Sequence, residues 1–268
     1  MRIMPFQDSP PLRYYTFENL SRYGVVHGVF TRRGGVSPAP WASLNMGATV
    51  GDEWERVQEN IRRAFSALGL PVESRYDSWL VHGKEAVYAA EPRPVSRDSS
   101  PQKADIITTD QPAVTLVMRF ADCVPILLYD PRRQALALAH AGWKGTVIGV
   151  ARAAVEAMAE RFGSKPADLL AAIGPAIGPN HYEIGAEVAE QVQNAFGAEA
   201  ERLLPKRNGS IFFDLWEANR LTLRLAGVPD EQIEVARICT AANLQDWYSH
   251  RAEHGKTGRF GVLAALPR

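Results

Sequence analysis

The sequence predicts an α+β or layered α/β protein, in which mixed sheets are flanked by helices. Three observations predict this class: short apolar runs of strand length, longer segments with helical periodicity, and neighbouring apolar runs close enough to form hairpins. Hairpin neighbours indicate antiparallel pairs, so the sheets are expected to be mixed rather than purely parallel. The 268 residues are expected to form a single domain, with residues 1–22 as an N-terminal extension.

The predicted strands are short and apolar, as strands buried on both faces are. Residues 23–31 begin the series with an apolar, β-branched stretch. Three central runs, at 114–118, 125–129 and 135–139, lie close together in the chain and are expected to be buried. Later strands are predicted at 169–173, 233–238 and 260–266.

The predicted helices show apolar residues every three or four positions, or are rich in good helix formers. The clearest is residues 53–68, where four apolar side chains fall on one face. Asp214 is expected to cap a helix at 215–226, and Gly227 is expected to end it. The stretch 91–103 carries Pro, Ser, Arg and Asp in succession and predicts a surface loop. Further helices are predicted at 145–161 and 185–195.

The composition argues against several classes of protein. Lys plus Arg and Asp plus Glu both number 30, so the net charge gives no electrostatic basis for binding nucleic acid or an anionic membrane. No apolar run approaches the roughly 18 residues of a membrane span, and the first twenty residues lack the layout of a secretory signal. Two cysteines in a chain of this size favour a reducing compartment, so we expect a cytoplasmic protein.

Two histidines and one cysteine carry the most distinctive chemistry. His82 follows a short apolar run, Cys123 lies in a turn between two predicted strands, and His140 ends a third. All three are therefore predicted at the junction of a strand and a loop, and their side chains can meet at one end of the sheet. One thiolate and two imidazoles suit Zn²⁺ and leave a fourth coordination position open. The residues alone leave open whether a metal is bound, because buried His and Cys are common and these three follow no local spacing rule.

Other candidate residues have two interpretations each. Asp122, beside Cys123, is expected either to orient a metal ligand or to cap a turn. Arg32, Lys144 and Arg251 each lie beside a glycine or a turn, so each is either a surface charge or part of an anion site. The remaining candidates are expected to be structural: His27, Trp143, Trp247 and Cys239 in the core, and His181 in a loop.

Ordered motifs along the chain resemble the YfiH-type proteins, also called laccase-domain proteins and named multicopper polyphenol oxidoreductases. The strongest agreement is Ala-Asp-Cys-Val-Pro at 121–125, followed by His-Ala-Gly-Trp-Lys-Gly at 140–145. The resemblance runs from about Gly28 to the C-terminus and is specific because several separate motifs occur in the right order. The other motifs are at 30–37, 43–47, 81–83, 173–178 and 257–259.

The resemblance implies a zinc site made by His82, Cys123 and His140. It also implies a layered fold of mixed sheets, shared with the catalytic domain of the cytotoxic necrotizing factor toxins. Members phosphorolyse adenosine, inosine, guanosine and methylthioadenosine, and they deaminate adenosine. The expected partners are therefore a purine nucleoside and phosphate, bound by a monomer or homodimer. On this basis Cys123, His140 and Asp122 are expected to be catalytic, and substrate is expected to contact Arg32, Asn45, Lys144 and Arg251.

Three positions depart from the family pattern, and none belongs to the predicted metal site. Leu80 stands where the family often has Gln, and Lys144 where Arg is commoner. His250 replaces a usual Tyr, in a position where it could alter contacts with substrate.

Three other functions remain open from the sequence. Cys123 and His140 could act without metal as nucleophile and base of a hydrolase, which fits the link between some YfiH-type proteins and peptidoglycan precursor editing. Two histidines and a cysteine can also bind copper, as in a polyphenol oxidase or laccase. The chain has six histidines but no His-x-His pair, which coupled copper sites use. A partner-binding domain without catalysis has the loop 91–103 as its only support.

Overall fold

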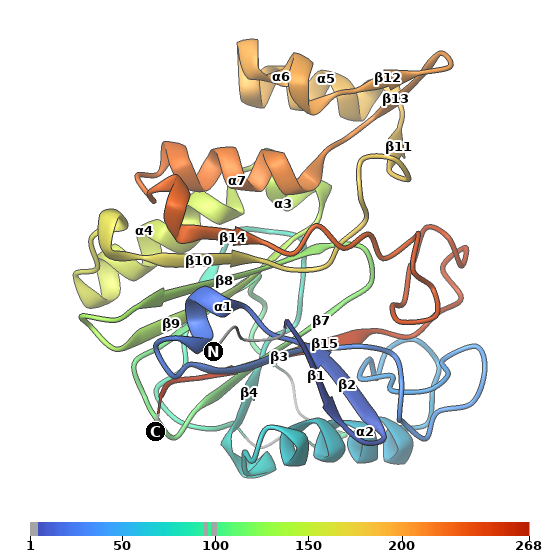
Figure 1. The fold of residues 1–268 in the computed structure, drawn as a ribbon, viewed down its shortest axis with the longest axis vertical. Coiled ribbons are helices and arrows are strands. Elements are labelled where there is room, and N and C mark those ends of the chain that lie inside the picture. The colour runs from blue at the N-terminus through green and yellow to red at the C-terminus, as the bar shows by residue number, and fades with distance from the viewer. Residues whose placement is uncertain (1–4, 94–95, 98–100, 268) are drawn as a thin grey trace.

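Two six-stranded mixed sheets form the framework of the protein (Figure 1). The structure is a computed structural model, and it describes residues 5–93, 96–97 and 101–267. The first sheet has the order β1-β2-β3-β15-β7-β4, and only β4 and β7 are parallel neighbours. Its strands are β1 (Phe6–Ser9), β2 (Leu12–Tyr15), β3 (Val26–Phe30), β15 (Phe260–Ala265), β7 (Thr115–Phe120) and β4 (Arg75–Asp77).

The second sheet has the order β14-β10-β8-β9-β6-β5. Its central pair, β8 and β9, is the hairpin that the spacing of the apolar runs predicts. Parallel pairs lie at both edges, β10 with β14 and β5 with β6. The strands are β14 (Ile233–Val235), β10 (Leu170–Ile173), β8 (Val124–Asp130), β9 (Ala135–Ala141), β6 (Ile106–Thr109) and β5 (Ala86–Tyr88).

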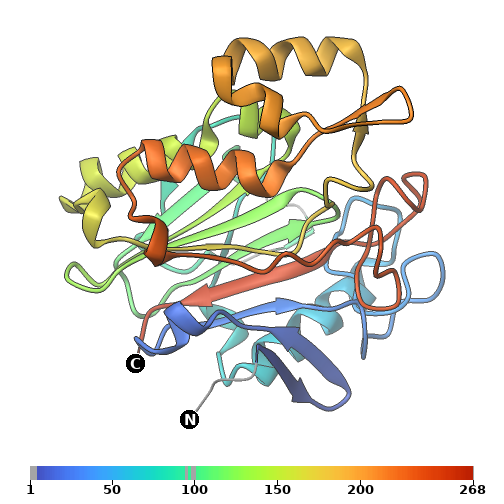
Figure 2. The ribbon, with the colours of Figure 1, turned by 45° about the horizontal axis from the view of Figure 1, so that its top comes forward.

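Six of the seven α-helices of the described residues lie outside the two sheets, whereas α1 (Glu18–Ser21) lies at the edge between them and buries Leu20 in the layer that they share (Figure 2). Helix α2 (Trp54–Ala67) covers the first sheet, and α3 (Trp143–Val147), α4 (Val150–Phe162) and α7 (Leu215–Leu225) cover the second. No helix in the described part of the chain is long and apolar enough to cross a membrane. The others are α5 (Ala186–Phe196) and α6 (Ala200–Leu203), with single 3₁₀ turns at Val72–Ser74, Pro166–Asp168, Gly197–Glu199 and Asp230–Gln232. A small third sheet contains β11 (Glu183–Ile184), β13 (Ser210–Phe212) and β12 (Lys206–Arg207).

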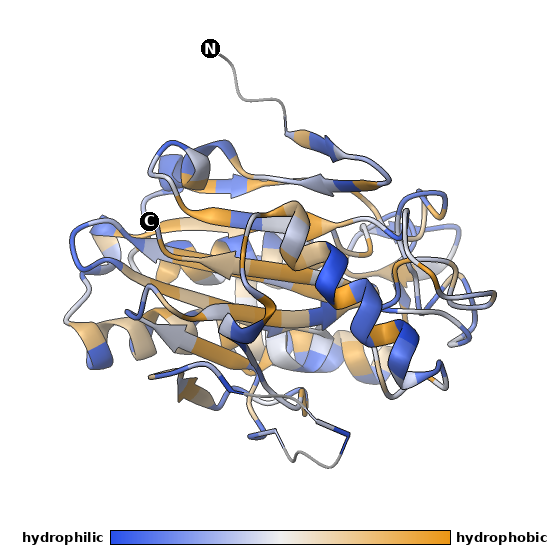
Figure 3. Ribbon diagram, turned by 90° about the horizontal axis from the view of Figure 1, so that it is seen from below, coloured by the Kyte–Doolittle hydropathy of each residue, from blue (hydrophilic) through white to orange (hydrophobic). Residues whose placement is uncertain are grey.

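The core is divided into three layers by the alternation of side chains along each strand. In β7, Leu116 and Met118 point between the two sheets, whereas Val117 points to the side of α2. Ile61 of α2 packs in the same layer as Val117, and the strands of both sheets are mostly hydrophobic (Figure 3). The predicted layered fold of mixed sheets flanked by helices is therefore confirmed.

Residues 5–22, the described part of the predicted N-terminal extension, pack on the rest of the fold, because β1 and β2 belong to the first sheet and Asn19 bonds to the backbone of the second. Two predictions about elements need correction. The helix predicted at 145–161 is interrupted at Gly149, whose left-handed backbone (φ 82°) separates α3 from α4. The strand predicted at 233–238 ends at Val235.

The helix boundaries at 215–226 follow the predicted signals. The Asp214 side chain accepts a hydrogen bond from the backbone N–H of Glu217, and Gly227 takes a left-handed conformation after the last turn. In the predicted loop, residues 91–93, 96–97 and 101–103 contain no helix and only a single bridge, from Lys103 to Trp79. Positions 94–95 and 98–100 of that prediction lie outside the described residues.

Candidate metal centre and active site

His82, Cys123 and His140 converge on one point between the two sheets. Their ligand atoms all lie within 4.8 Å of one another, so this group could hold a metal ion. Cys123 is in the turn from β7 to β8, as predicted. The placement of the histidines differs from the prediction, because His140 lies inside β9 and His82 follows no regular strand, only the isolated bridge at Trp79.

A buried carboxylate that the sequence analysis missed, Asp105, fixes both histidines. Its Oδ1 lies 2.8 Å from Nδ1 of His140 and also accepts a bond from the backbone N–H of His82. Its Oδ2 accepts bonds from the backbone N–H groups of Val81 and Gly83. Burial raises the pKa of Asp105, but its bonds to His140 and to this backbone outweigh burial and lower it. Because Nδ1 of His140 is engaged by this carboxylate, its other nitrogen, Nε2, is left to bind a metal.

Strand pairing explains why Asp105 reaches His140. Strands β6 and β9 are antiparallel with Ile106 opposite Ala139, so the preceding residue, Asp105, lies opposite His140. The backbone N–H of His140 donates to the carbonyl of Asp105 at 2.8 Å, which continues the ladder. The available sequence signal was a lone Asp directly before an apolar run, but its partner in the ladder could be identified only once the register was known.

The turn after β9 needs a glycine to leave room for the centre. A Cβ added at Gly142 would lie 3.0 Å from Sγ of Cys123 and 3.1 Å from Cδ2 of His82. Neither atom is at the end of a flexible side chain, since both belong to the group formed by His82, Cys123 and His140. Gly142 therefore allows the chain to pass close behind two of the three ligands.

Cys123 and His140 form a mutually stabilising charged pair. Burial opposes ionisation of the thiol, but the charge of His140 and hydrogen bonds from His140 and His82 lower the pKa of Cys123 to about 6. Burial likewise lowers the pKa of His140, yet the Cys123 thiolate and Asp105 raise it to about 9. A thiolate with two imidazoles is a donor set that suits zinc and also copper. The chemistry of these residues therefore fits a metal.

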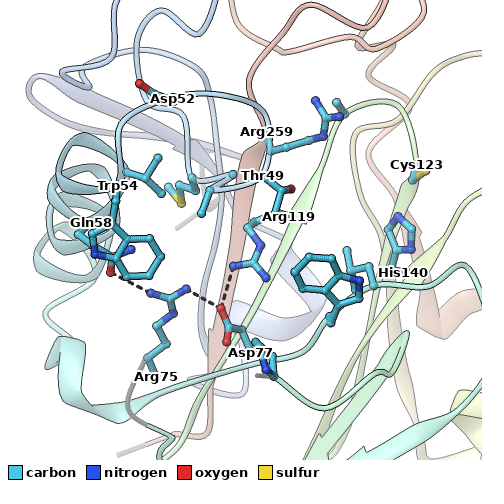
Figure 4. Close-up of a pocket in the computed structure, with 18 of the residues that line it drawn as sticks. Thr49, Asp52, Trp54, Gln58, Arg75, Asp77, Arg119, Cys123, His140 and Arg259 are labelled. Atoms are coloured by element: carbon cyan, nitrogen blue, oxygen red, sulfur yellow. Dashed lines mark hydrogen bonds and ion pairs between the residues drawn. The ribbon is translucent and has the colours of Figure 1, made fainter. Parts of the chain in front are cut away.

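The three residues line a cavity of about 800 Å³, within the size range of small-molecule sites (Figure 4). His82 and Trp79 are exposed at its edge, whereas His140 is buried in its wall. The described part of the predicted loop 91–103 contributes Ser96, Arg97 and Pro101 to the lining. Charged and amide groups from the first sheet and from α2 line the opposite side: Gln58, Arg75, Asp77, Arg119 and Arg259.

The four predicted substrate-binding residues do not line this cavity. Asn45 is fully buried and uses its side chain to hold the backbone of Gly47 and Arg259. Arg32 is ion-paired with Glu253 and stacks on the ring of Tyr248. Their side chains therefore stabilise loops that surround the site.

Lys144 and Arg251, the other two, are exposed away from the cavity. The ammonium of Lys144 lies over the ring of Trp143, and Arg251 lies over Tyr182 and donates to the carbonyl of Glu183.

Asp122 is buried next to Cys123, but its carboxylate faces other partners. One oxygen accepts from the hydroxyl of Thr240 at 2.6 Å and the other from the backbone N–H of Arg251 at 2.7 Å. Of the two interpretations of Asp122, these bonds match the capping of a turn, since Asp105 is the carboxylate that contacts a histidine of the centre.

The residues predicted to be structural divide into two groups. His27 and Trp247 are buried in the core as predicted. Trp143 and Cys239 are only partly buried, and Sγ of Cys239 lies 3.5 Å from Nδ1 of His181.

Comparisons with known proteins identify the family of this chain. The family model described as multi-copper polyphenol oxidoreductase laccase matches residues 26–267. The chain belongs to this laccase-domain family. A purine nucleoside phosphorylase from Bacteroides thetaiotaomicron is 35% identical over 92% of this chain and 94% of its own. Purine nucleoside phosphorylase YlmD from Geobacillus stearothermophilus is 39% identical over 91% and 90%.

Solved structures of laccase-domain proteins share the fold. YlmD from Geobacillus stearothermophilus superposes with a TM-score of 0.91 at 34% identity, covering 98% of this chain and 99% of its own. The hypothetical protein YfiH from Bacillus licheniformis gives 0.88 at 33% identity, covering 98% and 100%. The predicted resemblance to YfiH-type proteins is confirmed.

Two of the three departures from the laccase-domain pattern line the cavity. These are Leu80 and His250, whereas Lys144 lies outside it.

Proposed function

We propose that this laccase-domain chain is a zinc-dependent purine nucleoside phosphorylase acting on adenosine, inosine, guanosine and methylthioadenosine, and that it also deaminates adenosine. The observation that carries the proposal is the convergence of three ligand atoms within 4.8 Å on the wall of a cavity large enough for a nucleoside. Relatives named purine nucleoside phosphorylase, at 35% and 39% identity over nearly the whole chain, support this class of reaction.

His82, Cys123 and His140 would hold the zinc, which when bound supplies a Lewis acid beside the attacking oxygen of phosphate or water. Asp105 keeps the proton of His140 on Nδ1 and holds the backbone on either side of His82. Trp79, about half exposed at the edge of the cavity, offers a flat apolar surface on which a purine can stack.

The two reactions differ in the bond that breaks. In phosphorolysis the bond from ribose C1′ to the purine nitrogen breaks, a bond from C1′ to a phosphate oxygen forms, and the phosphate proton passes to the departing purine. In deamination water adds to C6 of adenosine and ammonia leaves, so the glycosidic bond stays intact. Both reactions need the nucleoside beside the metal centre, which is the part of the cavity bounded by His82 and Trp79.

The test is metal analysis and turnover of freshly purified protein beside Cys123→Ala. We expect about one zinc per chain in the wild type, with adenine and ribose 1-phosphate formed from adenosine and phosphate. Both the zinc and the product should be lost in Cys123→Ala, because the variant lacks the thiolate ligand. Stoichiometric zinc with no adenine released would refute the phosphorylase.

A metal-free hydrolase is the second candidate, and the lowered pKa of Cys123 beside His140 favours it. Such an enzyme, acting in peptidoglycan precursor editing, would use Cys123 as nucleophile and His140 as base. A chelator separates the two proposals, because the hydrolase would keep its activity without metal. Copper oxidation of phenols has less support, since the described residues contain one His/Cys group of this kind. Both cysteines are free thiols, which fits the cytoplasmic location that we propose.

A further inference from the structure

Four arginines line the cavity, and one of them, Arg97, is ion-paired with Glu55. Neither the metal centre nor the surface for the purine uses the other three: Arg75, Arg119 and Arg259. All three come from the first sheet or its continuation and belong to its α2 side. In Figure 4, Arg119 lies between the Arg75–Asp77 pair and His140. The cavity thus has a metal-binding wall and, opposite it, a wall rich in guanidinium groups.

The arginines carry more positive charge than their neighbours balance. Arg75 and Arg119 share one oxygen of a single carboxylate, Asp77, which is almost fully buried. Arg259 forms no ion pair with a carboxylate of the described residues, and its Nη1 donates instead to the carbonyls of Thr257 and Gly258. Cys123 and Asp122 act on Arg259 electrostatically, but neither forms an ion pair with its guanidinium, so a negatively charged ligand would stabilise this partly buried wall.

The other carboxylate of the cavity, Asp52, is already engaged. Its oxygens accept bonds from Ser37, Asn45 and the backbone N–H of Glu53. Figure 4 shows it on the far side of the cavity from His140. Asp52 therefore does not neutralise Arg119 or Arg259.

Strand register brings Arg119 and Arg259 together. Strands β7 and β15 are antiparallel with Arg119 opposite Gly261, so residue 259 lies opposite Ala121 on the same face. Diagonal neighbours of this kind are about 7–8 Å apart, and long side chains from such positions can converge on one tetrahedral anion. Arg119 is also only four residues before Cys123, so the same turn links this pair to the metal centre.

We propose that Arg119 and Arg259 form the binding subsite for inorganic phosphate, and that Asp77 and Arg75 position Arg119. The planar fork of arginine matches the oxygens of phosphate, and the subsite shares a cavity with His82, Cys123 and His140. The proposal rests on the phosphorylase function for the identity of the anion. It reassigns phosphate binding from Arg32, Lys144 and Arg251, which lie outside the cavity lining.

The test is calorimetric titration of inorganic phosphate into the metal-loaded full chain. The variants are Arg119→Gln, Arg259→Gln and Arg259→Lys, with Arg152→Gln on the exposed face of α4 as the matched control. We expect each Gln variant to bind phosphate about tenfold or more weakly, Arg259→Lys to be intermediate, and the control to be unchanged. Unchanged phosphate affinity in both Arg259 variants would overturn the proposal.

Thermal melting accompanies each titration, because Arg119→Gln removes a partner from buried Asp77. The Arg259 variants leave that ion pair intact, so they test the subsite even where Arg119→Gln fails to fold. An adenosine analogue that the enzyme neither cleaves nor deaminates is then titrated into phosphate-saturated protein, where its affinity should equal that in phosphate-free protein; mutual exclusion of the two ligands would overturn the proposal. Titration with AMP tests whether the arginines bind free phosphate or the phosphate group of a nucleotide. The proposal would also be overturned if the loss of Arg259 weakened AMP binding more than it weakened phosphate binding.

Turnover separates this proposal from the proposed function. Phosphate binding that needs the arginines, in a protein that cleaves no nucleoside, would refute the phosphorylase and keep the subsite. Phosphorolysis with an unchanged KM for phosphate in the Arg259 variants would keep the phosphorylase and refute the subsite. In the expected outcome the KM for phosphate rises about tenfold in Arg259→Gln, while adenosine deamination, which uses water, is retained.

Discussion

Two buried aspartates lie near the candidate metal centre and hold different parts of the molecule. Asp122 is adjacent to Cys123 in the chain, yet its oxygens bond to Thr240 and to the backbone of Arg251. Asp105 is 35 residues before His140, yet it contacts that ring and the backbone around His82. Adjacency in the chain therefore does not identify the aspartate that contacts a histidine of the candidate site, whereas strand pairing does.

Removal of Asp105 should have the largest effect. In Asp105→Ala, three backbone N–H groups and Nδ1 of His140 lose their acceptor in a buried site, and neither histidine is held in place. We expect zinc affinity to fall by about 10- to 100-fold, as for other groups that orient metal-binding histidines, with a parallel loss of activity. Competition with a chromogenic chelator measures the affinity. Zinc binding as tight as in the wild type would show that Asp105 is only a structural residue.

His27, which is distant from both aspartates in the chain, should make the free energy of unfolding depend on pH. Its Nε2 accepts a bond from the backbone N–H of Phe17, so the buried ring must be neutral with its proton on Nδ1, next to the carbonyl of Val25. Burial lowers the pKa of His27 to about 4 from 6.5. The unfolded state therefore takes up the proton first as the pH falls.

The free energy of unfolding should consequently decrease between pH 6.5 and about 4, by on the order of 3 kcal/mol from this residue. Urea unfolding of the wild type and His27→Gln at pH 7 and pH 4.5 measures this. We expect the wild type to lose more stability over this interval than the variant. Equal losses would show that His27 is not held neutral.

Asp122→Ala tests whether Asp122 stabilises the fold without contributing to zinc binding. The variant loses two hydrogen bonds to a buried carboxylate, so the free energy of unfolding should fall by about 2 kcal/mol. Zinc affinity should stay within about threefold of the wild type, because Asp122 touches neither histidine in the way that Asp105 does. Denaturant titration and zinc competition measure the two quantities. Loss of zinc with unchanged stability would reverse the roles assigned to the two aspartates.

Trp79→Ala should have the smallest effect. Trp79 lies two residues before Val81, the first residue whose backbone Asp105 holds, and about half of its surface is exposed at the cavity. Loss of the stacking surface should cost about 1 kcal/mol, so the KM for adenosine should rise about fivefold with little change in zinc content or in the KM for phosphate. Trp79→Phe, which keeps an aromatic ring, is the matched control and should recover most of the affinity. An unchanged KM for adenosine in Trp79→Ala would place the purine elsewhere.

Local patterns predicted most of the fold. The apolar runs became β3, β7, β8, β9 and β10 with ends shifted by at most three residues, because burial of a strand depends on its own composition. The break at Gly149 and the short edge strand β14 were missed, since Ala-rich flanks and apolar runs carry no sign of a left-handed turn or of a ladder that ends early.

The candidate site was predicted only in part. The ligand trio came from motifs, but the residues around it depend on register between strands that are distant in the chain. Arg75, Arg119 and Arg259 lie on one wall because β4, β7 and β15 are neighbours, and no spacing in the sequence shows this. Arg32 and Arg251 were chosen for their positions beside glycines and turns, and the structure uses both to hold loops.

The position of β15 has a consequence for how the protein is made. This strand lies between β3 and β7 in the first sheet and is the last of the three to be synthesised. The sheet therefore cannot close until Phe260–Ala265 has left the ribosome, so folding of this layer follows translation of its neighbours. Translation that terminates before residue 259 would yield a chain that lacks both the strand in the middle of that sheet and Arg259. We therefore expect incomplete products to lack a folded first sheet and to be open to proteolysis.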